Sequence, residues 1–250
     1  MQPQDFPSKW LFPVKENEKA TIQLICFPFA GGGASVYSSW QESLSPTIQL
    51  RPVQLPGREN RFGEPAINRF ETILARLVSV IKPLTKKRWA VFGHSMGALL
   101  AAELVIQLMD EGCCIPPEHV FLSGKSPLHL PSQRPLIGNL NDDDLLTQLQ
   151  LRYGAQNTPE QKELMRLMLN TIRADVQIVE SHIRSKPLSL PCPITAILGT
   201  DDLSVTVQDM QQWKTYTNNH FSMIKIPGDH FYLQSSRKEI TACINQKLCD

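Results

Sequence analysis

Hydrophobic and polar positions along this chain follow two patterns that alternate. Short apolar runs that end near glycine or proline have the length of buried strands, and longer segments repeat apolar residues every three or four positions, as helices do. The predicted strands are 21–29, 50–55, 89–92, 120–122, 193–198 and 221–226. The predicted helices are 67–84, 95–111, 207–216 and 231–248. This alternation indicates an α/β fold with a mostly parallel sheet and helices on both faces.

The segment 129–187 interrupts the alternation, because it contains two or three predicted helices and no convincing strand. Asn141 stands where a helix N-cap would, and Thr158 followed by Pro159 is typical of a second helix start. The helix predicted from there to Val179 is more apolar than one buried stripe requires. We favour the interpretation that this insertion is a lid over a substrate channel. The alternative is an ordinary helical excursion packed on the core.

Length, charge and cysteine content narrow the class of protein. The 250 residues suffice for one domain, 1–250, with a full hydrophobic core. A formal net charge of +1 does not suggest a nucleic-acid partner. No apolar run approaches the roughly 20 residues that cross a membrane, and residues 1–10 lack the pattern of a signal peptide. The six cysteines form no C-x-x-C pair, which favours free thiols in the cytoplasm over a disulfide or zinc framework.

A G-x-S-x-G motif at 93–97 follows the predicted strand 89–92 and leads into a predicted helix. This context is typical of a nucleophile elbow, in which glycines let the strand and helix approach closely and the serine is exposed on a strained turn. We therefore predict that Ser95 is a catalytic nucleophile. The backbone N–H of Met96 is predicted to be one donor of an oxyanion hole.

Two later strand ends supply an acid and a base in the order that this elbow requires. His230 follows the strand 221–226 and is predicted to take the proton from Ser95, while a carboxylate after the strand 193–198 orients its imidazole. Asp201 and Asp202 compete for that role, and we favour Asp202 because it lies farther round the turn. We interpret the remaining histidines as elbow packing, for His94, and as surface or core residues, for His119, His129, His182 and His220.

The loop 27–34, after the first strand, is predicted to supply the second oxyanion donor. We call it the glycine loop. Its glycines allow close backbone approach to a ligand, and the N–H of Ala30 is our candidate. The glycine run lacks the Lys-Ser/Thr of a phosphate-binding loop and the spacing of a dinucleotide fingerprint.

Several motifs share the same family pattern. They are F-P-F-A-G-G at 27–32, Trp40, Q-L-P-G-R-E at 54–59, G-H-S-M-G at 93–97 and G-D-H-F-Y-L at 228–233. Together they closely resemble the type II thioesterases, the stand-alone α/β-hydrolases associated with nonribosomal peptide synthetases, polyketide synthases and animal fatty acid synthase. The resemblance runs from about residue 22 to the C-terminus, and P-G-R-E is its most discriminating part. The chain departs from the family at Asp229, where a glycine is usual, and at Leu203, where proline is common.

The resemblance implies an α/β-hydrolase fold and hydrolysis of acyl thioesters on the phosphopantetheine arm of acyl- or peptidyl-carrier proteins. Such enzymes remove aberrant acyl groups. A thioester is already activated, so a Ser-His-Asp site needs neither a metal nor a cofactor of its own. We expect a cytoplasmic monomer whose partners are carrier domains, with no nucleic-acid or membrane partner.

Two other functions compete with thioester hydrolysis. A carboxylesterase or lipase acting on oxygen esters is disfavoured by the P-G-R-E turn and the glycine loop, and a non-catalytic carrier-binding module is disfavoured by the complete set of serine, acid and histidine. Basic residues that are possible carrier contacts are interpreted instead as solvated surface; they are Arg58, Arg61, Lys86, Lys87 and Arg88.

Overall fold

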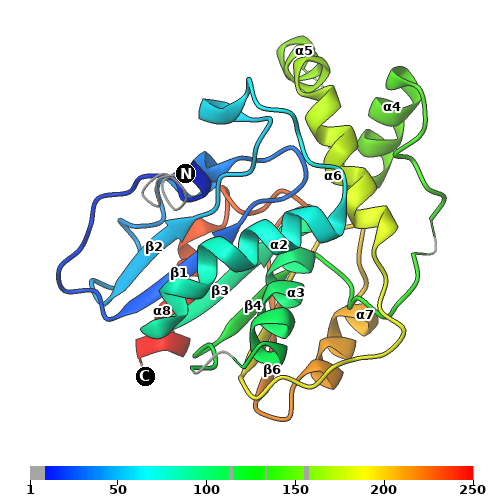
Figure 1. Ribbon diagram of the computed structural model, residues 1–250. Coiled ribbons are helices and arrows are strands. Elements are labelled where there is room, and N and C mark those ends of the chain that lie inside the picture. The colour runs from blue at the N-terminus through cyan, green and yellow to red at the C-terminus, as the bar shows by residue number, and fades with distance from the viewer. Residues whose placement is uncertain (1–8, 113–114, 133, 155–157, 250) are drawn as a thin grey trace.

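A computed structural model describes residues 9–112, 115–132, 134–154 and 158–249. Within these residues, six strands form one sheet in the order β2-β1-β3-β4-β5-β6, and every neighbouring pair is parallel (Figure 1). The strands are β1 Ile22–Phe27, β2 Ile48–Pro52, β3 Arg88–His94, β4 Val120–Ser123, β5 Ile194–Gly199 and β6 Phe221–Ile226. The parallel sheet confirms the predicted fold class. The predicted free thiols of Cys113 and Cys114 and the N-terminal residues 1–8 lie outside the described residues.

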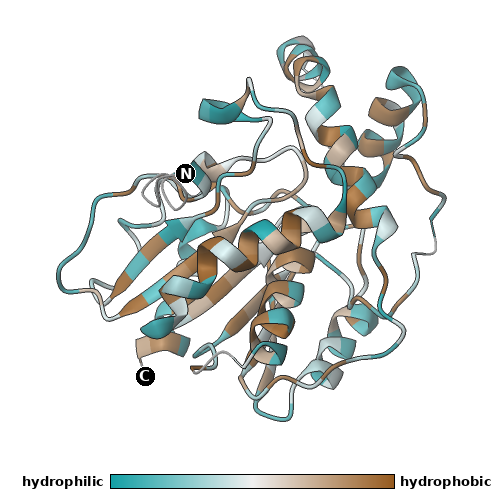
Figure 2. Ribbon diagram, in the orientation of Figure 1, coloured by the Kyte–Doolittle hydropathy of each residue, from teal (hydrophilic) through white to brown (hydrophobic). Residues whose placement is uncertain are grey.

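Helices cover both faces of the sheet and enclose two apolar cores. One core lies between the sheet and the helices α2 (Phe70–Ile81), α3 (Met96–Asp110) and α7 (Val207–Gln211). The other lies beneath α8 (Arg237–Cys249) on the opposite face. Alternate residues of one strand enter opposite cores, and Figure 2 shows these central strands and α3 as hydrophobic along much of their length. Among the described helices, none combines the length and the hydropathy that a membrane span requires.

The insertion forms a separate group of helices beside the sheet, α4 (Asp142–Tyr153), α5 (Pro159–Leu167) and α6 (Leu169–Ser181) (Figure 1). The Asn141 side chain caps α4 by accepting the Asp144 N–H at 3.0 Å, as predicted. The single helix expected up to Val179 is instead broken at Met168. After the break, α6 buries Ile172, which joins a small apolar core shared with α4.

The last helix begins six residues later than predicted. It starts at Arg237 rather than Phe231, because residues 231–236 form turns that bury Tyr232 and Leu233 under the sheet. Apolar residues at helical spacing in this segment therefore pack without forming a helix.

Candidate active site

Ser95 stands on the turn between β3 and α3 in a strained backbone conformation. Its φ and ψ are 54° and −116°, a region that residues with a side chain rarely adopt. The turn needs glycine on both sides, because a Cβ on Gly93 would lie 2.1 Å from the carbonyl oxygen of Gly97, and one on Gly97 would lie 2.1 Å from that of Phe27. The crowding raises the serine at the carboxyl end of the sheet.

The structure brings Ser95, His230 and Asp202 into one hydrogen-bonded row. The Oγ atom of Ser95 lies 3.0 Å from Nε2 of His230, and the Nδ1 atom of His230 lies 2.8 Å from Oδ2 of Asp202. Both His230 and Asp202 are buried, whereas Asp201 is exposed and its carboxylate accepts the Thr200 hydroxyl at 3.2 Å. Of the two competing carboxylates, Asp202 is therefore the one that meets the imidazole.

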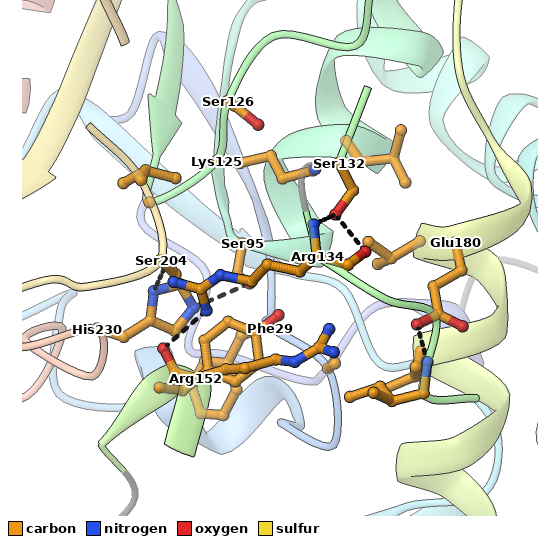
Figure 3. A pocket seen from close by; sticks show the side chains of 18 of the residues that line it. Phe29, Ser95, Lys125, Ser126, Ser132, Arg134, Arg152, Glu180, Ser204 and His230 are labelled. Atoms are coloured by element: carbon orange, nitrogen blue, oxygen red, sulfur yellow. Dashed lines mark hydrogen bonds between the residues drawn. The ribbon is translucent and has the colours of Figure 1, made fainter. Parts of the chain in front are cut away.

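Ser204 is a second contact of this row that the sequence reasoning missed. Its N–H and hydroxyl donate to Oδ1 of Asp202 at 2.8 and 2.6 Å, and its Oγ lies 2.9 Å from Nδ1 of His230 (Figure 3). Burial by itself raises the pKa of Asp202, but the hydrogen bonds and charge of His230, together with the Ser204 donors, outweigh burial and lower that pKa. The carboxylate is thus held ionised. A serine two residues after the acid was the available sequence signal.

His94 packs behind the row, as predicted for an elbow residue. Its Nε2 lies 2.7 Å from the carbonyl oxygen of His230, and its Nδ1 lies 2.8 Å from the Ser123 hydroxyl. Complete burial, with a smaller contribution from His230, lowers the pKa of His94 to about 3, so the ring is neutral at physiological pH. A neutral ring with Nε2 protonated donates to the His230 carbonyl and accepts from Ser123, which holds the backbone of the histidine in place.

The glycine loop forms a tight turn beside the serine. The Gly32 N–H donates to the Phe29 carbonyl at 2.9 Å, and Gly31 has φ +76° while Ala30 has no positive φ. These features define a type II β-turn with Gly31 in third position. Ala30 lines the same cavity as Ser95. Among the described residues, neither the Ala30 N–H nor the Met96 N–H donates to a protein acceptor.

The motif Q-L-P-G-R-E at 54–59 holds this loop and the residue after it from the other side. Gln54 accepts the Ala34 N–H at 2.7 Å, and Glu59 accepts the Ser35 hydroxyl at 2.5 Å. Arg58 is 1% exposed and donates to the Gly32 carbonyl at 3.1 Å. The motif is therefore part of the support of the loop.

The prediction that Arg58 and Arg61 are solvated surface is wrong. Arg58 forms a buried two-pronged ion pair with Asp175 of α6, at 2.6 and 2.8 Å. Arg61 is also buried; it pairs with Glu64 at 2.6 Å and places its guanidinium 4.6 Å from the centre of the Trp10 ring. Burial is stabilised here because each guanidinium has a partner carboxylate and further acceptors.

A cavity of about 580 Å³ opens from Ser95 toward the inserted helices (Figure 3). Apolar side chains from the sheet side and from the insertion line it together; they include Phe29, Leu99, Leu128, Leu149, Ile172, Val176 and Val179. The Tyr153 ring, at the end of α4, lies 4.7 Å from the His230 ring. His182 also lines the cavity, but its Nε2 is held 2.8 Å from Glu103 and its ring stacks on Phe70.

Comparisons with known proteins agree on one family. Residues 22–248 match the model of the thioesterase domain. The chain is 34% identical over 237 residues to the gramicidin S biosynthesis protein GrsT of Aneurinibacillus migulanus, covering 93% of this chain and 91% of that protein. It is 36% identical over 246 residues to LgrE of Brevibacillus parabrevis, covering 97% and 93%; the name of that protein denotes a linear gramicidin dehydrogenase.

Among solved structures, the type II thioesterase BorB of the borrelidin biosynthetic cluster superposes with a TM-score of 0.87 at 30% identity, covering 96% of this chain and 98% of that one. The glycine loop has no dinucleotide-binding spacing, so the name of LgrE gives no reason to expect a dehydrogenase. The family match, the α/β-hydrolase fold and these likenesses agree with the resemblance seen in the motifs. The chain belongs to the thioesterase family, among the type II thioesterases.

Proposed function

We propose that this thioesterase hydrolyses acyl thioesters through an acyl-enzyme formed on Ser95. His230 accepts the Oγ proton through Nε2 while Oγ bonds to the carbonyl carbon of the thioester. Asp202 holds the tautomer of His230 that leaves Nε2 free to accept and stabilises the imidazolium. The strongest support is the row of contacts from Ser95 to His230 and Asp202, at 3.0 and 2.8 Å.

The oxyanion of the tetrahedral intermediate is bound by two backbone donors, the N–H groups of Ala30 and Met96. Support comes from their lack of protein acceptors and from the position of Ala30 beside Ser95 in the cavity wall. The carbon–sulfur bond then breaks, and the leaving thiolate takes the proton from His230 and departs as the thiol. Water, deprotonated by the same imidazole, attacks the acyl-serine, and Oγ recovers its proton as the carboxylic acid leaves.

The substrate is an acyl group on the phosphopantetheine arm of an acyl- or peptidyl-carrier protein, and the reaction clears aberrant acyl groups from a synthase. The similarity to GrsT, named for gramicidin S biosynthesis, and to BorB, a type II thioesterase from the borrelidin biosynthetic cluster, supports this assignment. The mainly apolar cavity suits an acyl chain. No resident cofactor enters the reaction, and we expect the enzyme to act as a cytoplasmic monomer.

The segment 129–187 serves as a lid in this proposal. Its helices contribute Leu149, Ile172 and Val179 to the cavity that begins at Ser95, so a chain bound there lies between the sheet and the insertion. Met165 lines this cavity, and Met168 packs against the small apolar core beside it. Methionine adapts readily to ligands of different shape.

The first experiment compares the wild type with Ser95→Ala on a panel of acylated carrier proteins followed by mass spectrometry. We expect at least about a 10³-fold loss of hydrolysis, since the covalent route is removed while binding survives. An unchanged rate would refute Ser95 as nucleophile. Hydrolysis of simple oxygen esters, with no reaction on any acyl-carrier substrate, would favour a carboxylesterase instead.

A further inference from the structure

Asp175 is a buried carboxylate that the reaction described above does not use. It lies on α6 with its side chain fully buried, and three N–H donors converge on it. Oδ2 accepts the Gly31 N–H at 2.7 Å and Nη1 of Arg58 at 2.6 Å, while Oδ1 accepts Nη2 of Arg58 at 2.8 Å. A carboxylate so fully satisfied fixes the groups around it.

The Gly31 N–H belongs to the central peptide of the type II β-turn Phe29–Gly32. Rotating that peptide converts a type II turn into a type I turn, in which the third residue has a negative φ. Gly31 is therefore free to follow such a rotation, because glycine is allowed on both sides of φ zero. The bond to Asp175 holds the central peptide in the type II orientation, and Arg58 holds the next carbonyl, that of Gly32. The Ala30 N–H belongs to the preceding peptide, so these contacts position it through the backbone of the turn.

Residues of α6 next to Asp175 also support the glycine loop by packing against it. A Cβ on Gly31 would lie 2.8 Å from Cγ1 of Ile172, and the Thr171 hydroxyl donates to the Gly57 carbonyl at 2.6 Å. Ile172 also lines the substrate cavity. One helical turn of the insertion thus touches the glycine loop, the P-G-R-E turn and the space for the acyl chain.

We propose that Asp175 and Arg58 are positioning residues that hold the Phe29–Gly32 turn so that the Ala30 N–H faces the oxyanion. The orientation of this donor therefore depends on the position of α6, the helix that carries Asp175. The inference rests on the proposed function, because it assumes that Ala30 is an oxyanion donor. Asp175 does not touch the reacting atoms; it acts through Gly31. The insertion therefore completes the catalytic machinery as well as covering the cavity.

The test compares Asp175→Asn and Arg58→Lys with the wild type. Asn keeps the size of the side chain but loses the charge and one acceptor, and Lys keeps the charge while losing the two-pronged geometry and, with it, the contact to Gly32. We expect kcat to fall about 10²-fold for Asp175→Asn and about tenfold for Arg58→Lys, approaching the cost of losing one oxyanion donor. KM should change less than about threefold, because ground-state binding is not affected.

A second readout separates positioning from general damage. Affinity for a boronic acid, which forms a tetrahedral adduct on serine, should fall by the same factor as kcat, whereas affinity for an unreactive thioether analogue should not change. Leu248→Ala on α8 is the matched control, since Leu248 belongs to the core on the face of the sheet opposite to the one that α6 joins through Ile178, and its truncation should leave kcat unchanged in the folded protein.

Arg58→Lys keeps Asp175 paired, so it provides the test where Asp175→Asn does not fold. Wild-type kcat and wild-type boronic acid affinity in either folded variant would overturn the inference. If Ser95→Ala is inactive while these variants behave as wild type, only the positioning role fails. If Ser95→Ala is active, the proposed function fails first.

Discussion

Ala30 occupies the second position of the turn Phe29–Gly32, and its side chain is not what the proposed chemistry uses. The useful group is its backbone N–H, which no ordinary side-chain substitution removes. A type II β-turn sets φ near −60° at its second residue, which is the value that the proline ring imposes. Proline at this position therefore deletes the donor while keeping the turn.

Ala30→Pro should lower kcat by about 10²–10³-fold, the usual cost of losing one oxyanion donor, with a thermal midpoint close to that of the wild type. Ala30→Gly, which keeps the N–H, is the matched control and should stay within a few-fold of the wild-type rate. Steady-state kinetics on an acyl-carrier substrate measures both. Full activity in a folded Ala30→Pro protein would remove Ala30 from the oxyanion hole.

The inserted helices α4 to α6 set the size of the space offered to the acyl chain. Val179 of α6 lines the cavity, whereas Leu167, at the end of α5, is 63% exposed on the outer side. A larger side chain at position 179 fills the cavity, whereas the same side chain at position 167 lies in solvent.

Val179→Phe should therefore change chain-length preference. If the ring displaces about two methylenes of a bound chain, at about 0.8 kcal/mol each, the ratio of kcat/KM for a decanoyl over an acetyl carrier substrate falls roughly tenfold. Leu167→Phe is the control and should leave the ratio unchanged. A wild-type ratio in Val179→Phe would mean that the acyl chain does not lie along α6.

The boundary between α5 and α6 shows what an element-scale pattern misses. The apolar spacing runs continuously across Met168, so the sequence predicts one helix. Beyond the break, Thr171 and Asp175 bond to the P-G-R-E turn and the glycine loop, and Ile172 packs against Gly31. Contacts with residues more than 100 positions away decide the direction of α6, and no local pattern carries them.

At the scale of the whole molecule, buried histidines link stability to pH. His119 is 3% exposed, and its Nε2 lies 2.7 Å from the Thr195 hydroxyl. Burial, with the nearby Lys247 and His220, lowers the pKa of His119 to about 4. The unfolded chain takes up a proton near the ordinary value of about 6.5, whereas the folded chain does not, so stability falls as pH decreases from about 6.5 to 4.

His119 alone should make the free energy of unfolding about 2 kcal/mol lower at pH 5 than at pH 8. His119→Gln retains a side chain able to bond the Thr195 hydroxyl but has no titrating group at this position. Its free energy of unfolding should therefore fall less between pH 8 and pH 5 than that of the wild type, by about the contribution of His119. Urea unfolding at the two pH values measures the difference. Equal losses in both proteins would contradict the predicted linkage.

The sequence by itself determined the order of strands and helices, the parallel sheet, the insertion, and the residues proposed for the catalytic row. These features depend on local periodicity and on short motifs in fixed contexts, such as G-x-S-x-G between a strand and a helix. It also narrowed the acid to two neighbours. Only the fold decided between them, because the turn after β5 directs Asp202 to His230 and leaves Asp201 in solvent.

The tertiary structure alone explained the P-G-R-E turn. An arginine in a turn is typical of a surface position, and its partner Asp175 stands 117 positions later in a helix of the insertion. Nothing in either segment marks the pair, because a buried ion pair is stabilised by the joint geometry of both charges and not by the sequence around each one. The burial of Arg58 becomes favourable only when the P-G-R-E turn, the glycine loop and α6 come together in the folded chain.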